Sequence, residues 1–256
     1  MPLRFRFILV LVFPLLAGGF IQAKELVIVA HRGVNHLAPE NTIAATQKYV
    51  DLGLDYVEID VRTSKDGVMY ILHDKTLDRT TNGSGEIKER GSEYIDQLDA
   101  GSWFGPEFTD QRVPRLKPYL RQFKGKIKIY FVVKAADLAE LVALVHEAGF
   151  ARDWFFWFFK DDRARELRAL DRHIPLKMNA VDVTGLRSVM DYNPQIIEYR
   201  LEHLTPDFIA FCREHDLKLM AHALGEGFET KYQEIIDSAA DIVNLDRADE
   251  MIERLK

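Results

Sequence analysis

Short runs of β-branched and aromatic residues alternate along this chain with longer segments in which apolar residues recur at helical spacing. This regular alternation predicts parallel strands joined by helical crossovers. Eight such strand–helix pairs in a chain of this length predict the α/β class and a TIM (β/α)₈ barrel. A doubly wound open sheet is the alternative, because periodicity does not show whether a sheet closes. The predicted strands are 26–31, 56–61, 128–134, 153–159, 175–180, 195–201, 217–223 and 241–245, and the predicted helices are 40–52, 115–123, 137–148, 161–171, 183–191, 205–215, 228–239 and 248–255.

One connection is too long for a simple loop. Residues 64–114 lie between the second predicted strand and the helix at 115–123. Connections longer than about 15 residues usually carry structure or function of their own. We therefore predict one barrel domain over residues 24–256, with a small insertion at about 64–114. In a barrel this insertion would emerge at the face where active sites are built.

Residues 1–23 have the pattern of a secretory signal peptide. Arg4 and Arg6 form a short basic region, residues 7–20 are apolar and uncharged, and Ala23 is a small residue before two charged ones. The apolar run is shorter than the ~20 residues that a membrane-spanning helix needs. We expect cleavage near Ala23 and export to a periplasm or out of the cell, with an uncleaved anchor or a buried helix as the alternative. The mature chain is expected to have no transmembrane segment.

Composition argues against nucleic acid as a partner. The chain has 34 Lys and Arg residues against 40 Asp and Glu, a formal net charge of −6. A general binder of nucleic acid or anionic membranes would carry a basic patch, so we expect a small-molecule partner. Cys212 is the only cysteine, which excludes an intrachain disulfide. Its apolar helical surroundings predict burial, not use as a nucleophile.

Two carboxylates share one face of the second predicted strand. Glu58 and Asp60 are two positions apart in YVEIDV, and strand side chains alternate between faces. In a barrel both would point into the interior, where carboxylates are costly unless they are paired or bind a cation. Hard oxygen ligands suit Ca²⁺ or Mg²⁺. A solvent-facing edge strand with ordinary charges is the alternative.

Two histidines follow strands on either side of this acidic pair. His31 ends the first predicted strand and His73 ends the run VMYILHD. A single histidine in such a place is usually structural, but two imidazoles bracketing two carboxylates can serve as general base and general acid. Arg32, next to His31, offers a guanidinium for a phosphate. Together these groups match the needs of phosphodiester cleavage.

The order of these motifs resembles the glycerophosphodiester phosphodiesterase family. The similar segments are HRG (31–33), PENT (39–42), EIDV (58–61), SKDG (64–67), LHD (72–74), LDRTTNGSG (77–85), VPRL (113–116) and DIVNLD (241–246). The resemblance is dense over residues 28–134 and thin but collinear afterwards. It implies a TIM barrel and a divalent cation, Ca²⁺ or Mg²⁺. It also implies hydrolysis of glycerophosphodiesters to glycerol 3-phosphate and an alcohol.

The resemblance also implies roles for individual residues. His31 and His73 are similar to the family's acid–base pair, and Glu58 and Asp60 to its first two metal ligands. Two more residues resemble its phosphate-binding groups, Arg32 and Lys134. In a family-like mechanism one histidine deprotonates a glycerol hydroxyl that attacks phosphorus, and the other protonates the leaving alcohol. Water then opens the cyclic phosphate. Which histidine plays which part stays open.

The third predicted strand departs from the family pattern. The family carries Glu or Asp two positions before the lysine, where this chain has Val132. Valine cannot bind a cation, so the site loses one anionic ligand of three. Three interpretations follow: Glu198 or Asn179 substitutes, water fills the place in a weaker site, or the protein is a catalytically impaired phosphate-ester binding barrel.

Other features allow further alternatives. A barrel phospholipase would need apolar surface at the mouth, for which Trp103 and Phe104 in the insertion are candidates, although they could equally fill the insertion's own core. The aromatic run at 153–159 is interpreted as a buried barrel strand and not as a ligand platform. The head group, the physiological metal and the oligomeric state stay open.

Overall fold

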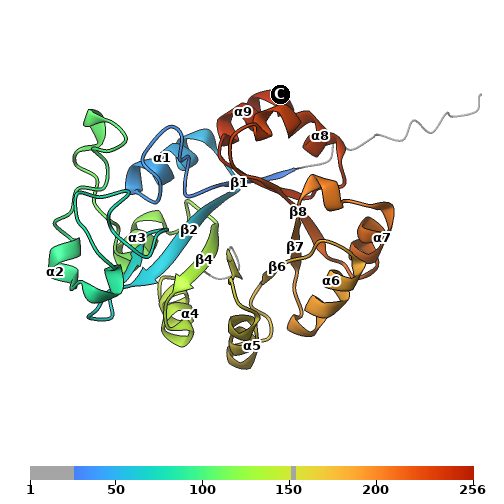
Figure 1. Cartoon of the computed structure of the whole chain (residues 1–256), viewed down its shortest axis with the longest axis horizontal. Helices are drawn as coiled ribbons and strands as arrows, with labels where there is room; N and C mark the ends of the chain where they lie inside the picture. Colours follow the sequence, from blue (N-terminus) through green and yellow to red (C-terminus); the bar gives the residue numbers. More distant parts are fainter. Residues whose placement is uncertain (1–25, 151–153) are drawn as a thin grey trace, which may run out of the picture.

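Eight parallel strands form a nearly closed barrel in the computed structural model, which describes residues 26–150 and 154–256 (Figure 1). The sheet order is β5-β4-β2-β1-β9-β8-β7-β6, and a ninth strand, β3, pairs antiparallel with β2 outside this path. Between β5 and β6 the closing contact is a single bridge from Phe156 to Leu176. The predicted TIM barrel is thereby confirmed. The strands are β1 (Val27–Ala30), β2 (Tyr56–Thr63), β3 (Met69–Ile71), β4 (Ile129–Ala135), β5 (Trp154–Trp157), β6 (Lys177–Asn179), β7 (Ile196–Tyr199), β8 (Lys218–Ala223) and β9 (Ile242–Leu245).

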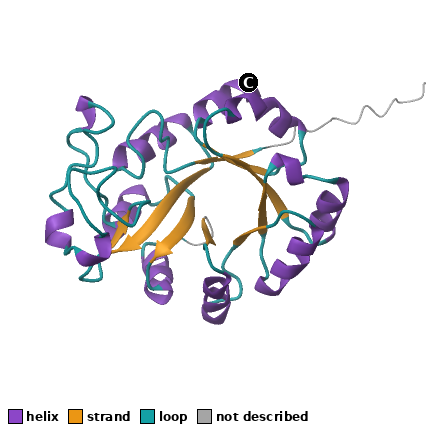
Figure 2. Cartoon of the chain, viewed as in Figure 1, coloured by secondary structure: helices purple, strands orange, loops and turns teal. Residues whose placement is uncertain are grey.

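Helices cover the outside of the barrel, except α2, which lies in the segment between β2 and α3 (Figure 1 and Figure 2). They are α1 (Ile43–Leu52), α2 (Ser92–Ile95), α3 (Leu116–Phe123), α4 (Leu138–Glu147), α5 (Asp161–Leu170), α6 (Val183–Val189), α7 (Pro206–Glu214), α8 (Tyr232–Asp237) and α9 (Ala248–Leu255). Short 3₁₀ turns lie at Ile87–Glu89, Pro106–Phe108, Met190–Tyr192, Leu201–His203 and Phe228–Lys231. The last of these turns replaces the start of the helix predicted at 228–239, so α8 is shorter than predicted.

The start of α1 differs from the prediction in a way that matters for the site. The helix was expected from residue 40, but it begins at Ile43, and the Thr42 side chain caps it by accepting a hydrogen bond from the Ala45 amide at 3.2 Å. Asn41 takes a left-handed conformation (φ 57°), which a helix excludes. Glu40 and Asn41 therefore lie in a turn at the mouth of the barrel, where their side chains can reach the functional residues.

Alternation along each strand separates two apolar cores. Outward-facing residues such as Ile129, Phe131 and Val133 pack against the helices. Inward-facing residues fill the barrel interior as a separate cluster, made of Val29, Tyr130, Val132, Phe155, Ile196, Met220 and Ile242. This inner cluster forms the apolar floor on which the polar side chains at the carboxyl ends of the strands stand.

The segment between β2 and α3 packs around a third cluster of its own. Its buried residues are Tyr70, Leu72, Leu77, Ile87, Ile95, Leu98, Ala100 and Val113. Figure 1 places this segment beside β2, at one side of the barrel. It holds His73 close to the carboxyl ends of the strands.

Several sequence predictions fall at the limits of what the structure describes. The predicted signal peptide, residues 1–23, lies outside the described residues, as does Asp153 of the predicted fifth strand. Export therefore stays a prediction. Within the described ranges, no helix has the length and apolar character needed to cross a membrane. Cys212 is buried in α7, as expected.

Candidate active site

Polar side chains gather in a cavity of about 260 Å³ at the carboxyl ends of the barrel strands. This end is where TIM-barrel enzymes carry their active sites, because the loops that follow the strands meet there. Five of the six predicted site residues line it, namely His31, Arg32, Glu58, His73 and Lys134. The sixth, Asp60, is fully buried beside them, 3.3 Å from Lys134. The structure thus brings all six together.

His31 is held between two carboxylates. Its Nδ1 lies 2.6 Å from Asp246 Oδ1, and its Nε2 lies 3.5 Å from Glu58 Oε1. Because a carboxylate only accepts, Nδ1 carries the proton and Nε2 faces the cavity. Burial lowers the pKa of His31, but the charge of Glu58 and the hydrogen bond to Asp246 outweigh burial, so the pKa is raised. The two carboxylates therefore orient the imidazole and stabilise a proton on it.

His73 forms a similar pair with the opposite electrostatic outcome. Its Nδ1 lies 2.7 Å from Asp74 Oδ1, and Asp74 in turn accepts a hydrogen bond of 2.6 Å from Arg79 Nε. Burial lowers the pKa of His73, and the nearby charge of Asp60 offsets this only in part. The hydrogen bond from Arg79 holds the pKa of Asp74 well below its usual range. The two imidazoles that line this cavity thus have pKa values shifted in opposite directions.

Glu58 and Asp60 point inward from β2, as their spacing predicted. Glu58 Oε2 accepts a hydrogen bond of 2.6 Å from Asn244 Nδ2, and Asp60 Oδ2 accepts one of 2.8 Å from Asn41 Nδ2. Burial raises the pKa of Glu58 above its usual value, against the opposing charge of His31. Burial therefore outweighs the charges of His31 and Arg32, which both lower the pKa of Glu58.

Two cations complete the cavity next to these acids. Arg32 Nη1 donates to Glu40 Oε1 at 3.1 Å, while its Nε is buried without a hydrogen bond. Lys134 Nζ lies 3.3 Å from Asp60 Oδ1, and burial lowers the pKa of Lys134 although Asp60 opposes this effect. Both groups have donors left for a phosphate.

The acidic residues fit a divalent cation whose ligands come only partly from the protein. Asn244 Oδ1 is a buried oxygen that accepts no hydrogen bond, and the partner of Asp60 Oδ1 is Lys134 Nζ at 3.3 Å. Within the part of the chain that the structure describes, no group of three His, Cys, Asp or Glu side chains could hold a metal ion. Mg²⁺ is commonly bound by one or two carboxylates, with water and substrate phosphate supplying the rest. Glu58 and Asp60 match that arrangement.

Val132 lies beside Asp60 in the register of β2 and β4 and packs in the inner apolar cluster. Both proposed substitutes, Glu198 and Asn179, do face the cavity. The two oxygens of Glu198, however, are already bonded, one to Lys177 Nζ at 2.5 Å and the other to His222 Nδ1 at 2.7 Å. Glu198 is therefore already engaged with Lys177 and His222 and is a poor replacement ligand.

Sequence reasoning missed several residues that line the cavity or contact the residues that do. Asp246, which orients His31, lay in a segment noted only for its resemblance, and Lys177, His222 and Asn244 were not singled out. Strand alternation could have revealed Lys177, His222 and Asn244. Each lies two positions from another residue that faces the barrel interior, so its own side chain must also face inward. The aromatic run was also underestimated: Trp157 lines the cavity, although Trp154–Phe156 are buried as predicted.

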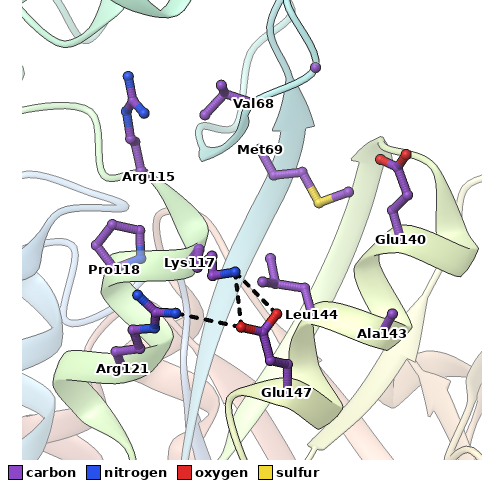
Figure 3. Close-up of a pocket in the computed structure, with 11 residues that line it drawn as sticks. Val68, Met69, Arg115, Lys117, Pro118, Arg121, Glu140, Ala143, Leu144 and Glu147 are labelled. Atoms are coloured by element: carbon purple, nitrogen blue, oxygen red, sulfur yellow. Dashed lines mark hydrogen bonds and ion pairs between the residues drawn. The ribbon is translucent and has the colours of Figure 1, made fainter.

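A larger hollow of about 580 Å³ lies elsewhere, between β3, α3 and α4 (Figure 3). Its walls are largely apolar, and on its rim Lys117 lies 2.9 Å and Arg121 3.5 Å from Glu147. No histidine lines it, and its second acid, Glu140, stands without an ion pair to the described residues. The chemistry is concentrated in the barrel cavity.

The place and content of that cavity are those of a TIM-barrel phosphodiester hydrolase. A model of the glycerophosphoryl diester phosphodiesterase family matches residues 31–222. The glycerophosphodiester phosphodiesterase of Caldanaerobacter subterraneus subsp. tengcongensis is 31% identical over 206 residues, which cover 76% of this chain and 84% of that protein. The chain therefore belongs to the glycerophosphoryl diester phosphodiesterase family.

Two further relatives agree with this assignment. The crystal structure of a glycerophosphodiester phosphodiesterase from Agrobacterium tumefaciens has a TM-score of 0.82 and 37% identity, covering 90% of this chain and 100% of that one. The YhdW protein of Bacillus subtilis is 45% identical over 107 residues, 42% of this chain. This last match spans only 44% of YhdW.

Proposed function

We propose that the chain hydrolyses glycerophosphodiesters to glycerol 3-phosphate and an alcohol, with the help of Ca²⁺ or Mg²⁺. One observation carries this proposal: two imidazoles, each oriented by a carboxylate, share a cavity with two inward acids and two cations. The family's name and the relatives named above support the substrate class. Export, which rests on residues 1–23, is proposed on the sequence alone.

The residues of the chain account for the proton transfers. One imidazole accepts the proton of the glycerol hydroxyl next to the phosphate, and this oxygen attacks phosphorus. The other imidazole donates a proton to the oxygen of the departing alcohol as its bond to phosphorus breaks. Water then adds to the cyclic phosphate with the two roles exchanged, which regenerates both imidazoles.

The charged residues hold the phosphate for these steps. Arg32 and Lys134 offer guanidinium and ammonium donors to its oxygens, a charge-assisted contact. Glu58 and Asp60 would hold the cation, which when bound withdraws charge from the phosphate oxygens. The apolar floor around Val132 keeps water away from the buried side of the cavity.

A direct assay tests the proposal. Purified protein is incubated with glycerophosphocholine and glycerophosphoglycerol, and glycerol 3-phosphate is measured after treatment with a chelator and after adding back Mg²⁺ or Ca²⁺. We expect release that needs the cation and that falls at least about 100-fold in His31→Gln and His73→Gln. His173→Gln, at an exposed histidine outside the cavity, is the matched control.

Two results would contradict parts of this function separately. Full activity after chelation would show that the reaction needs no divalent cation, and the proposal of a hydrolase would stand. No release from any diester under any condition would favour a phosphate-ester binding barrel. The comparisons with known proteins do not support that alternative. Neither Trp103 nor Phe104 lines the cavity, so the phospholipase alternative gains no support from the mouth residues.

A further inference from the structure

The wall of the cavity opposite the acids carries a second polar cluster that the mechanism does not use. It is made of Lys177 on β6, Glu198 on β7 and His222 on β8. Figure 1 shows β6, β7 and β8 on the other side of the barrel from β2 and β4. Lys177 is 1% exposed and Glu198 is 8% exposed, so this is a buried charge pair at a wall of the active-site cavity.

This cluster fixes one free hydrogen-bonding group. Lys177 Nζ donates to one oxygen of Glu198 at 2.5 Å, and the other oxygen accepts from His222 Nδ1 at 2.7 Å. The imidazole is thereby locked in one orientation, with Nε2 left without a hydrogen-bond partner among the described residues. The side-chain amide of Asn179 lines the same wall and also forms no hydrogen bond with the described part of the chain. Both groups can donate to or accept from a hydroxyl.

The aromatic residues of this wall are unsuited to a quaternary ammonium group. Such a group cannot donate hydrogen bonds and is recognised by open aromatic faces. Here Lys177 Nζ lies 4.3 Å from the ring centroid of Trp157, and Lys134 Nζ lies 4.3 Å from that of Phe159. The two rings also contact each other, with centroids 4.4 Å apart. Each ring thus already contacts an ammonium group of the protein, and a choline head group bound there would bring a second positive charge close to it.

The proposed reaction decides which half of the diester meets this wall. As its hydroxyl attacks, the glycerol half closes a five-membered ring on phosphorus, so it stays next to the phosphate, Arg32 and Lys134. The departing oxygen lies within reach of the imidazole that protonates it. The rest of the departing alcohol extends away from this ring, across the cavity toward β6, β7 and β8.

We propose that Lys177, Glu198 and His222 form a subsite for the departing alcohol, and that this alcohol is an uncharged polyol such as glycerol or inositol. The inference rests on the proposed function and adds the head-group class to it. His222 and Asn179 bind hydroxyl groups of the polyol, and Glu198 and Lys177 hold His222 in place. Choline diesters are poor substrates because they leave these polar groups unpaired and bring a cation next to two lysines.

The test compares substrates and one variant. With the full chain we measure kcat/KM for glycerophosphoglycerol, glycerophosphoinositol and glycerophosphocholine at a fixed cation concentration. We expect the polyol diesters to exceed the choline diester by at least about tenfold, the effect of one good hydrogen bond. His222→Phe keeps a ring but removes both nitrogens, and should lower kcat/KM for the polyol diesters about tenfold with little change for the choline diester. His173→Phe, at an exposed site outside the cavity, is the matched control.

The outcomes separate this inference from the proposed function. Equal turnover of choline and polyol diesters by the wild-type protein overturns the subsite and leaves the hydrolase intact. An equal loss on all substrates in His222→Phe assigns His222 to structure or chemistry and also overturns it. If that variant fails to fold by thermal melting, His222→Gln takes its place and the wild-type ratio still decides. Absence of all turnover contradicts the proposed function, and calorimetric titration with the same diesters then tests the selectivity by binding alone.

Discussion

Arg79 donates two hydrogen bonds of 2.8 Å to the carboxylate of Glu40, from Nη1 to Oε2 and from Nη2 to Oε1. Its Nε also bonds Asp74 at 2.6 Å. Glu40 holds Arg32 and Asp74 holds His73, so one side chain of the insertion orients a phosphate-binding group and an imidazole at once. This arrangement makes Arg79 a positioning residue, although it does not line the cavity.

Replacement of Arg79 should therefore impair catalysis more than stability. We expect Arg79→Ala to lower kcat/KM about 10- to 100-fold, because misplacement of catalytic groups by about 1 Å can have that effect. Arg79→Lys should recover only part of the activity, since lysine cannot form the bidentate contact. Steady-state kinetics and thermal melting check both. Arg115→Ala is the matched control, because Arg115 binds Asp96 in the same insertion and does not contact the site. Equal behaviour of Arg79→Ala and Arg115→Ala would rule out the positioning role.

The contact between Asp246 and His31 predicts a second effect. Asp246→Asn removes the charge that helps to raise the pKa of His31, so this pKa should fall. The limb of the pH–rate profile that belongs to His31 should move to lower pH, and kcat should drop by about 100-fold or more, as expected when a carboxylate no longer orients an imidazole.

Asp249→Asn provides the comparison for Asp246. Asp249 Oδ1 lies 3.0 Å from His36 Nε2, a similar pair outside the cavity. The pH profile of Asp249→Asn should stay as in the wild type. An unchanged profile in Asp246→Asn as well would mean that the contact with His31 has no part in catalysis.

The sequence was informative where a local rule determines a position. Alternation in YVEIDV placed Glu58 and Asp60 on the inner face of β2, and the residues after two strands placed His31 and His73 at the mouth. It was less informative where contacts join distant segments. Asp246 is 215 positions from His31, and Lys177 is 21 positions from Glu198, so neither pair is visible before the barrel closes. The start of α1 was predicted too early because Pro39 and Glu40 suit a first helical turn, whereas the left-handed Asn41 ends that possibility.

Val132 allows a direct test of how many acids the cation needs. Val132→Asp adds a carboxylate next to Asp60 in the strand register, which should lower the cation concentration for half-maximal activity about tenfold, since affinity follows the number of charged ligands. Burial of the new group should destabilise the cation-free protein by about 1–3 kcal/mol. Val132→Asn has nearly the same size without the charge and is the control. If both variants keep the wild-type cation requirement, the place beside Asp60 is not part of the cation site.

The buried pair of Lys177 and Glu198 predicts how stability depends on pH. Burial raises the pKa of Glu198, but the charge of Lys177 and the contact with His222 outweigh it and lower the pKa to about 2. A carboxyl group with a pKa lower in the folded than in the unfolded state stabilises the fold above its unfolded value and loses this contribution as the pH falls toward its folded value. The shift from 4.5 to about 2 corresponds to a stabilisation on the order of 3 kcal/mol at neutral pH.

Glu198→Gln should therefore be less stable than the wild type at pH 7, and the difference should shrink as the pH falls from about 5 toward 2, because the wild type then protonates Glu198. Urea unfolding across this range, in the presence of a chelator, measures the effect. Glu226→Gln is the control, since Glu226 is exposed and forms no ion pair with the described residues. If the gap between Glu198→Gln and the wild type stays constant from pH 7 to pH 2, the pair with Lys177 does not stabilise the ionised carboxylate. The wall of the cavity would then have to be held by packing around Trp157 instead.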